Sequence, residues 1–260
     1  MIVDCHTHVD MSTGQTGLSE HLAAAETVDA CIVLAEPHQA GEKTNSELAE
    51  YVARHSRKMV GFAFVDPVHD RGVTRDLAGV TEKLGLRGLA LYCCRCGFHP
   101  ADSRAMQLYE AAQQMALPVF FHNAGPVGAD AVLAYAQPML LDEVAQQLPD
   151  LKIIIGNMGA PFVEQTFAMV AKHPNVYGDL TIRPGNVWQT YNTVICAYEH
   201  GIMDKLLFGS GFPFATASQC IETLLGFNKL LADTNLPTVP RGSIRAIIER
   251  DTLEVLGLAR

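Results

Sequence analysis

The chain has 260 residues, 48% of them hydrophobic, and its 28 acidic residues outnumber 19 Lys and Arg residues to give a formal charge of -9. That length suits one large α/β domain, and the acidic excess would repel a phosphate backbone or an anionic membrane. Nucleic acid and membranes are therefore poor partners.

Short runs of aliphatic and β-branched residues recur along the chain and predict strands. They cover residues 2–5, 30–35, 59–65, 88–92, 118–122, 152–156, 175–180 and 205–209. The runs 118–122 and 152–156 have a continuous apolar centre, which is typical of a parallel strand that is covered on both faces.

Segments with a helical period lie between these runs, at residues 18–28, 46–56, 73–84, 103–115, 140–148, 162–172, 187–200 and 219–231. Strands that alternate with helices form a parallel sheet, and eight such units close into a (β/α)8 TIM-type barrel. Residues 240–258 predict an appended C-terminal helix. Because no interior linker or short repeat is visible, we expect a single α/β domain over residues 1–260.

Polar side chains stand at the predicted strand ends, where such barrels gather their active sites. His6 and His8 end the first strand, and two imidazoles one residue apart project the same way and can share one cation. His122 ends the fifth strand and Asp179 the seventh. The alternative interpretation of His6 and His8 is a pair of structural histidines, and His122 alone would more often be a hydrogen-bonded core residue.

Other strand ends also carry polar groups. Glu36, His38 and His99 could face the pocket or lie solvated on loops. The fourth strand ends in Cys93-Cys94-Arg95-Cys96, whose spacing differs from that of structural zinc sites, so packing is the first explanation. A thiolate there would become a ligand or a nucleophile only if Arg95 or a nearby imidazole lowered its pKa.

An ordered set of motifs along nearly the whole chain resembles the amidohydrolase superfamily, in its amidohydrolase-related branch that includes aminocarboxymuconate semialdehyde decarboxylase. The motifs are Asp4-Cys5-His6-Thr7-His8, Gly61-Phe62-Ala63-Phe64-Val65-Asp66-Pro67, Gly97-Phe98-His99-Pro100, Phe121-His122-Asn123-Ala124-Gly125, Gly156-Asn157-Met158-Gly159 and Leu206-Leu207-Phe208-Gly209-Ser210-Gly211-Phe212-Pro213.

The resemblance implies one divalent metal, commonly zinc, held by two strand-one histidines, a strand-five histidine and a strand-eight aspartate. His6, His8 and His122 match the three histidines. Gly211 stands where similar proteins carry the aspartate. Asn157 stands where they carry the histidine that activates water.

These two departures weaken ordinary metal-assisted hydrolysis without forbidding a metal. Three neutral imidazoles and a water make an acceptable tetrahedral catalytic zinc site. Asn157, however, cannot accept a proton near neutral pH, and a positioned acid or base typically contributes about 100-fold to 10,000-fold in rate. Asp179 is the best substitute for proton transfer, since the end of strand seven borders strand eight. Asn157 and Cys94 are expected to contact the substrate.

We therefore expect a metal-dependent hydrolase, or alternatively a decarboxylase, that acts on a small carboxylated or ring-derived metabolite. The competing hypothesis is a barrel that no longer catalyses and instead binds a small molecule or a protein partner. The residues leave both open, since Asn157 and Gly211 would also fit a protein that has abandoned catalysis.

The expected compartment is the cytoplasm. The first residues lack a basic segment followed by an apolar signal core, and the seven cysteines are scattered rather than arranged as a disulfide framework. Barrels of this kind often associate, so a homo-oligomer is one expected state.

Overall fold

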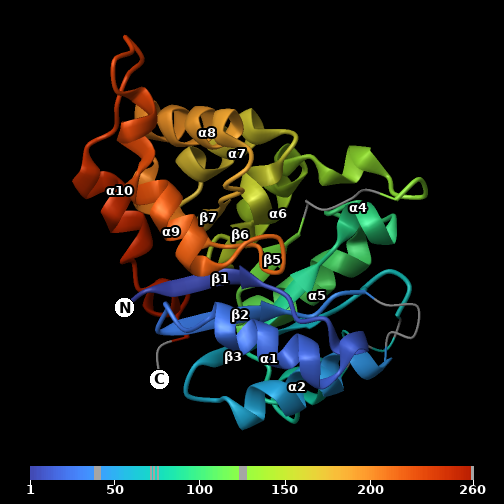
Figure 1. Cartoon of the computed structure of the whole chain (residues 1–260). Coiled ribbons are helices and arrows are strands. Elements are labelled where there is room, and N and C mark those ends of the chain that lie inside the picture. Colours follow the sequence, from blue (N-terminus) through green and yellow to red (C-terminus); the bar gives the residue numbers. More distant parts are fainter. Residues whose placement is uncertain (38–41, 71, 73, 75, 123–127, 259–260) are drawn as a thin grey trace.

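Eight parallel strands pair in chain order in the computed structural model of the protein (Figure 1). The structure describes residues 1–37, 42–70, 72, 74, 76–122 and 128–258. The strands are β1 (Val3–Thr7), β2 (Ala30–Leu34), β3 (Met59–Phe64), β4 (Gly88–Leu91), β5 (Val119–Phe121), β6 (Ile153–Ile155), β7 (Val176–Thr181) and β8 (Leu206–Gly209). All eight predicted strands are confirmed.

The sheet closes on itself where β1 meets the segment after β8. Thr7 forms a parallel bridge with Phe212. The His8 N–H donates to the Phe212 carbonyl, and the Gly211 N–H donates to the His6 carbonyl, both at 2.9 Å. The predicted TIM-type barrel is confirmed, and the backbone groups of His6 and His8 take part in the contacts that close it.

Helices cover the outside of the barrel and, in the case of the last one, its amino end. They are α1 (Gln15–Ala24), α2 (Glu42–Arg54), α3 (Leu77–Thr81), α4 (Cys93–Cys96), α5 (Ser103–Gln114), α6 (Asp142–Gln147), α7 (Val163–Lys172), α8 (Val187–Glu199), α9 (Ala217–Leu225), α10 (Arg241–Ile248) and α11 (Thr252–Val255). Local sequence fixes several starts. The Asp102 carboxylate accepts the Arg104 N–H at the start of α5, and Thr216 with Gln219 forms a capping box on α9.

Two expected helices are divided in the structure. Residues 219–231 form the end of α9 and then a 3-10 helix, η6 (Phe227–Leu231), while residues 240–258 form α10 and α11. The division between α10 and α11 has a local cause. Asp251 caps α11 by accepting the Glu254 N–H, and the Arg250 guanidinium donates to the carbonyls of Leu206 and Met203.

One face of every strand points into the barrel interior, and that interior is apolar at its amino end. Alternate residues of the strands meet α11 and the residues after it in one buried cluster. Leu253, Leu256 and Leu258 close this end of the barrel, at 3%, 1% and 3% exposure. The Arg87 guanidinium donates to the Leu258 carbonyl at 2.9 Å, which ties the segment to the start of β4.

A bulge in β1 changes which residues of that strand face inward. Asp4 pairs with Cys31 and Thr7 pairs with Val33, so three steps of β1 oppose two steps of β2. Val3 and Cys5 belong to the interior cluster. Because the bulge adds one residue, the even-numbered His6 and His8 then follow them on the interior side.

No helix among the described residues is long and apolar enough to cross a membrane.

Candidate metal centre

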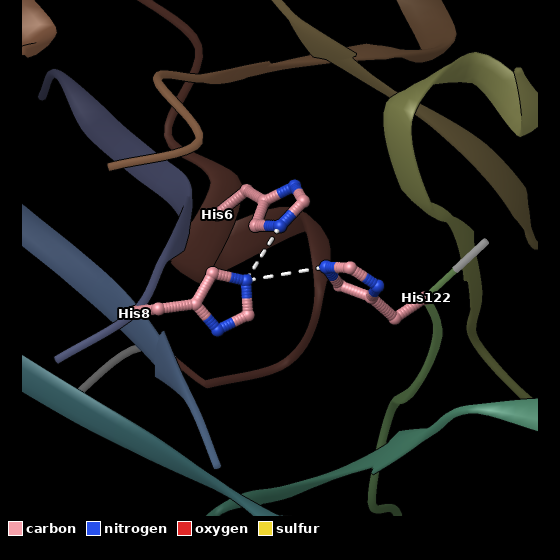
Figure 2. Close-up of side chains that lie close together, drawn as sticks. All are labelled: His6, His8 and His122. Atoms are coloured by element: carbon pink, nitrogen blue, oxygen red, sulfur yellow. Dashed lines mark hydrogen bonds between the residues drawn. The ribbon is translucent and has the colours of Figure 1, made fainter. Parts of the chain in front are cut away.

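Three imidazoles meet inside the barrel at its carboxyl end (Figure 2). His6 lies within β1, His8 follows that strand, and His122 follows β5. The Nε2 atom of His8 lies 3.0 Å from that of His6 and 3.2 Å from that of His122. Two nitrogens that bind one zinc ion tetrahedrally, with bonds of about 2.0–2.1 Å, lie about 3.3 Å apart. The observed spacing therefore fits one shared ion.

The other nitrogen of each strand-one ring is held by an acceptor. The Nδ1 atom of His6 lies 2.6 Å from a carboxylate oxygen of Asp179. The Nδ1 atom of His8 lies 3.3 Å from the Leu34 carbonyl and 3.3 Å from a carboxylate oxygen of Glu36. We assign the Nδ1 protons from these acceptors. In neutral rings the two Nε2 lone pairs then face each other at 3.0 Å, an arrangement that a cation between them stabilises.

Burial keeps two of the three rings neutral. Removal from water, followed by the electrostatic interaction with His6, lowers the pKa of His8 well below the usual 6.5. Burial also lowers the pKa of His122, with the charges of His6 and His8 as the next causes. His122 is further held by Tyr92, whose ring stacks on it with centroids 4.6 Å apart. Neutral, fixed imidazoles are the form that binds a metal.

Asp179 lies behind His6 rather than at the open side of the cluster. Its side chain is fully buried. It accepts the Asn157 backbone N–H at 2.8 Å and the Thr181 hydroxyl at 2.8 Å, while the Cys5 thiol lies 3.5 Å from its other oxygen. The carboxylate therefore reaches the three Nε2 atoms only through the His6 ring. Proton transfer by Asp179 stays a prediction.

Thr181 completes this group, and sequence reasoning missed it. Its hydroxyl oxygen lies 2.9 Å from His6 Nδ1 as well as 2.8 Å from Asp179. The available signal was its position two residues after Asp179 in the same strand, which puts both side chains on the same face of β7.

Two glycines of the β8 end leave the space that these side chains occupy. A Cβ atom on Gly209 would lie 2.4 Å from an Asp179 oxygen. A Cβ atom on Gly211 would lie 2.6 Å from the Thr181 methyl carbon, and Gly211 has a φ of +64°. A side chain at the position that carries the aspartate in similar proteins would therefore have to displace the Thr181 methyl group.

Of the two residues predicted to contact substrate, Asn157 lies against this group through its backbone. Asn157 belongs to a 3-10 turn, η4 (Gly156–Gly159), with a left-handed backbone, φ 50° and ψ 37°. Its N–H is committed to Asp179, and a substrate contact by its side chain stays a prediction. Cys94 is buried in α4 at 6% exposure, and its role also stays a prediction.

The cysteine cluster does not have activated thiols. Burial raises the pKa of Cys93 well above its usual value and raises that of Cys94 as well. Burial, with the nearby Asp66 charge, raises the pKa of Cys96 to about 12. These thiols stay protonated near neutral pH, so the thiolate alternative is not supported.

The remaining polar candidates separate into two groups. Glu36 contacts His8, whereas the exposed His99 accepts the Ala101 N–H through Nδ1 and packs on Tyr135, away from the cluster. His38 and residues 123–125 lie outside the described residues. The exposed Arg95 donates to the carbonyl of Pro37, the residue after Glu36, at 3.2 Å.

The comparisons with known proteins agree with this architecture. The model of a family described as amidohydrolase matches residues 3–239. A search of curated proteins found no match. Among solved structures, an uncharacterized TIM-barrel protein from Bordetella bronchiseptica has a TM-score of 0.75 at 17% identity, with 99% of this chain and 98% of that chain covered.

Two other similar structures carry functional names. A probable 2-pyrone-4,6-dicarboxylic acid hydrolase from Acinetobacter baumannii, with citric acid bound, has a TM-score of 0.69 at 14% identity, covering 98% of this chain and 99% of that one. A 5-carboxyvanillate decarboxylase from Novosphingobium aromaticivorans, with bound manganese, has a TM-score of 0.69 at 11% identity, covering 99% and 97%. At these identities the likeness shows the fold.

Proposed function

The chain belongs to the amidohydrolase family, and from that premise we propose that it is a metal-dependent enzyme, a hydrolase or a decarboxylase, of a small carboxylated or ring-derived metabolite. The observation that carries the proposal is the convergence of the His6, His8 and His122 Nε2 atoms. We also propose that residues 1–260 form one domain, since the strands close a single barrel.

The donor set fits a divalent ion, and zinc is our first choice. Neutral imidazole is a common zinc ligand, and a catalytic zinc site keeps a fourth position open. An ion held by His6, His8 and His122 would supply Lewis-acid polarisation of a substrate oxygen. Manganese, found in the decarboxylase from Novosphingobium aromaticivorans, is the alternative.

The chain's own residues would orient the substrate and the ligands. Asp179 holds His6, and Glu36 with Leu34 holds His8, so the rings present Nε2 to the open side. A carboxylated substrate is supported by Arg95, which has no acidic partner within the described part of the chain and whose charge also acts on His8 and His122. Guanidinium groups bind carboxylates through two parallel hydrogen bonds. Asn157 and Cys94 are proposed to line the same space.

A metal analysis tests the proposal. The purified protein is loaded with Zn²⁺ or Mn²⁺, desalted and assayed for bound metal by mass spectrometry. We expect close to one ion per chain in the wild type, and loss of that ion in His6→Ala and His122→Ala because each removes one of three ligands. His99→Ala removes an exposed histidine outside the cluster and should keep the ion. A wild-type protein that retains no metal would overturn the proposal.

One observation favours the noncatalytic alternative. Neither Gly211 nor Asn157 supplies the carboxylate or the base that similar proteins use at those positions, and Thr181 fills the space at Gly211. A screen of lactones and aromatic acids on the metal-loaded protein separates the two functions. Turnover that is lost in His122→Ala supports the enzyme. Ligands that bind and are recovered unchanged support a binding protein.

A further inference from the structure

The buried carboxylate behind His6 has a role that follows from its surroundings. We propose that Asp179 and Thr181 are positioning residues that fix the His6 ring for the metal and supply, from behind it, the negative charge that a strand-eight aspartate would have placed on the ion. This inference rests on the proposed metal function, since it concerns how the same site holds its ion.

The first step is the charge balance of Asp179. Its side chain has no exposed surface, and within the described part of the chain its one ion-pair partner is His6. Burying a carboxylate is costly unless hydrogen bonds and a positive charge compensate it. A cation at His6 Nε2 supplies that charge through the ring, as in the carboxylate, histidine and metal arrangements of other metalloproteins.

The second step is the fixed geometry of the carboxylate. Both Asp179 oxygens accept the Thr181 hydroxyl at 2.8 Å, and one also accepts the Asn157 N–H. The absence of a side chain at Gly209 lets the carboxylate lie against the β8 backbone. Asp179 is thereby locked in one orientation, with an oxygen 2.6 Å from His6 Nδ1.

The third step is the double contact of Thr181. Its hydroxyl bridges Asp179 and His6 Nδ1. Its methyl group occupies the direction in which a residue-211 side chain would extend, 2.6 Å from the position of a Cβ atom. Thr181 thus holds the Asp179 carboxylate, whose charge replaces that of a strand-eight aspartate. Its methyl group also occupies the space that an aspartate at position 211 would need. Among the described residues, the site then offers three histidine ligands.

Zinc affinity tests the two positioning roles. Competition with a chromophoric chelator gives the Zn²⁺ dissociation constant, and the visible spectrum of the Co²⁺-loaded protein reports ligand geometry. We expect Asp179→Asn to weaken zinc binding about 10- to 100-fold and Thr181→Val about 10-fold, with an altered Co²⁺ spectrum. Thr181→Ser, which keeps the hydroxyl, should bind zinc nearly as the wild type does.

The controls separate positioning from folding. Thr81→Val removes another buried threonine hydroxyl, in α3, and should change neither the affinity nor the spectrum. Thermal melts of the metal-free variants show whether each is folded. Wild-type affinity in both Thr181→Val and Asp179→Asn, with metal lost in His6→Ala, would overturn this inference and leave the proposed function intact. Absence of metal binding in the wild type would overturn both.

Discussion

The two ends of the barrel interior are made from the same strands but differ in polarity: the amino end is apolar and the carboxyl end is polar. At the amino end, Val3 packs with Leu253 and Leu256 in an apolar cluster whose aliphatic side chains need no hydrogen bonds. At the carboxyl end, His6 of the same strand meets a buried carboxylate and two further imidazoles. The first arrangement stabilises the fold. The second carries desolvated polar groups whose cost a bound ion would offset, so the packing that stabilises the fold and the proposed metal site lie at opposite ends of the barrel.

The largest expected loss of stability comes from a substitution at the amino end that leaves the carboxyl end unchanged. Leu256→Ala removes a side chain that is 1% exposed and leaves a cavity beside β1. We expect the free energy of unfolding to fall by about 3 kcal/mol, measured by urea denaturation of the metal-free protein. The Zn²⁺ dissociation constant of the folded variant should not change. Weaker zinc binding in the folded state would show that the two ends are coupled.

A smaller loss of stability is expected when Gly211 at the carboxyl end is replaced by the aspartate that similar proteins carry. Gly211→Asp brings a Cβ atom against the Thr181 methyl and places a side chain on a left-handed backbone, so we expect a loss of about 2–3 kcal/mol in unfolding free energy. Thr181→Ser removes that methyl. The double variant should regain part of the stability and bind zinc more tightly than Gly211→Asp alone.

A double variant that restores both residues carried by similar proteins, Gly211→Asp with Asn157→His, therefore lacks one change. It leaves the Thr181 methyl in place. Calorimetric titration with zinc distinguishes the three variants. Equal stability of Gly211→Asp and the wild type would show that Thr181 moves aside freely, and would remove the steric part of our inference.

A third expected effect is a pH dependence of stability that comes from a buried histidine near the carboxyl end, His21. His21 of α1 packs on Phe212, and its Nδ1 lies 2.7 Å from the Tyr51 hydroxyl. Its Nε2 is buried and has no hydrogen-bond partner among the described residues. Burial lowers the pKa of His21 to about 4. Because the folded-state pKa is below the unfolded value of 6.5, the unfolded chain binds the proton first, and stability falls as the pH drops from about 6.5 toward 4.

The expected size of that loss is about 2 kcal/mol between pH 7.5 and pH 5, from 1.36 kcal/mol for each unit of pKa difference. Urea denaturation of the metal-free protein at the two pH values measures it. His21→Met, which cannot titrate, should show a smaller loss over the same range. An identical loss in wild type and His21→Met would assign the pH dependence to other groups.

Sequence patterns predicted the architecture, and the resemblance to the amidohydrolase superfamily added the expectation that His6, His8 and His122 form one cluster. Alternating apolar runs and helical segments predicted eight strands, because a parallel strand covered on both faces must be continuously apolar. The spacing of His6 and His8, and the place of His122 after the fifth run, predicted that the three rings meet, since the carboxyl ends of all strands in a barrel lie at one rim. The distances between their Nε2 atoms agree.

Only the tertiary structure decided which groups lie behind and beside those rings. The bulge between Asp4 and Thr7 depends on pairing with β2 and leaves no periodic signal in the sequence. Asp179 lies behind His6, and Thr181 lies against Gly211, because β7 pairs with β8 so that Thr181 is opposite Gly209, close to where the chain turns at Gly211. The contacts of His6 with Asp179 and Thr181 join residues more than 170 positions apart in the chain. They depend on strand register and on the space that glycines leave, which a linear pattern does not record.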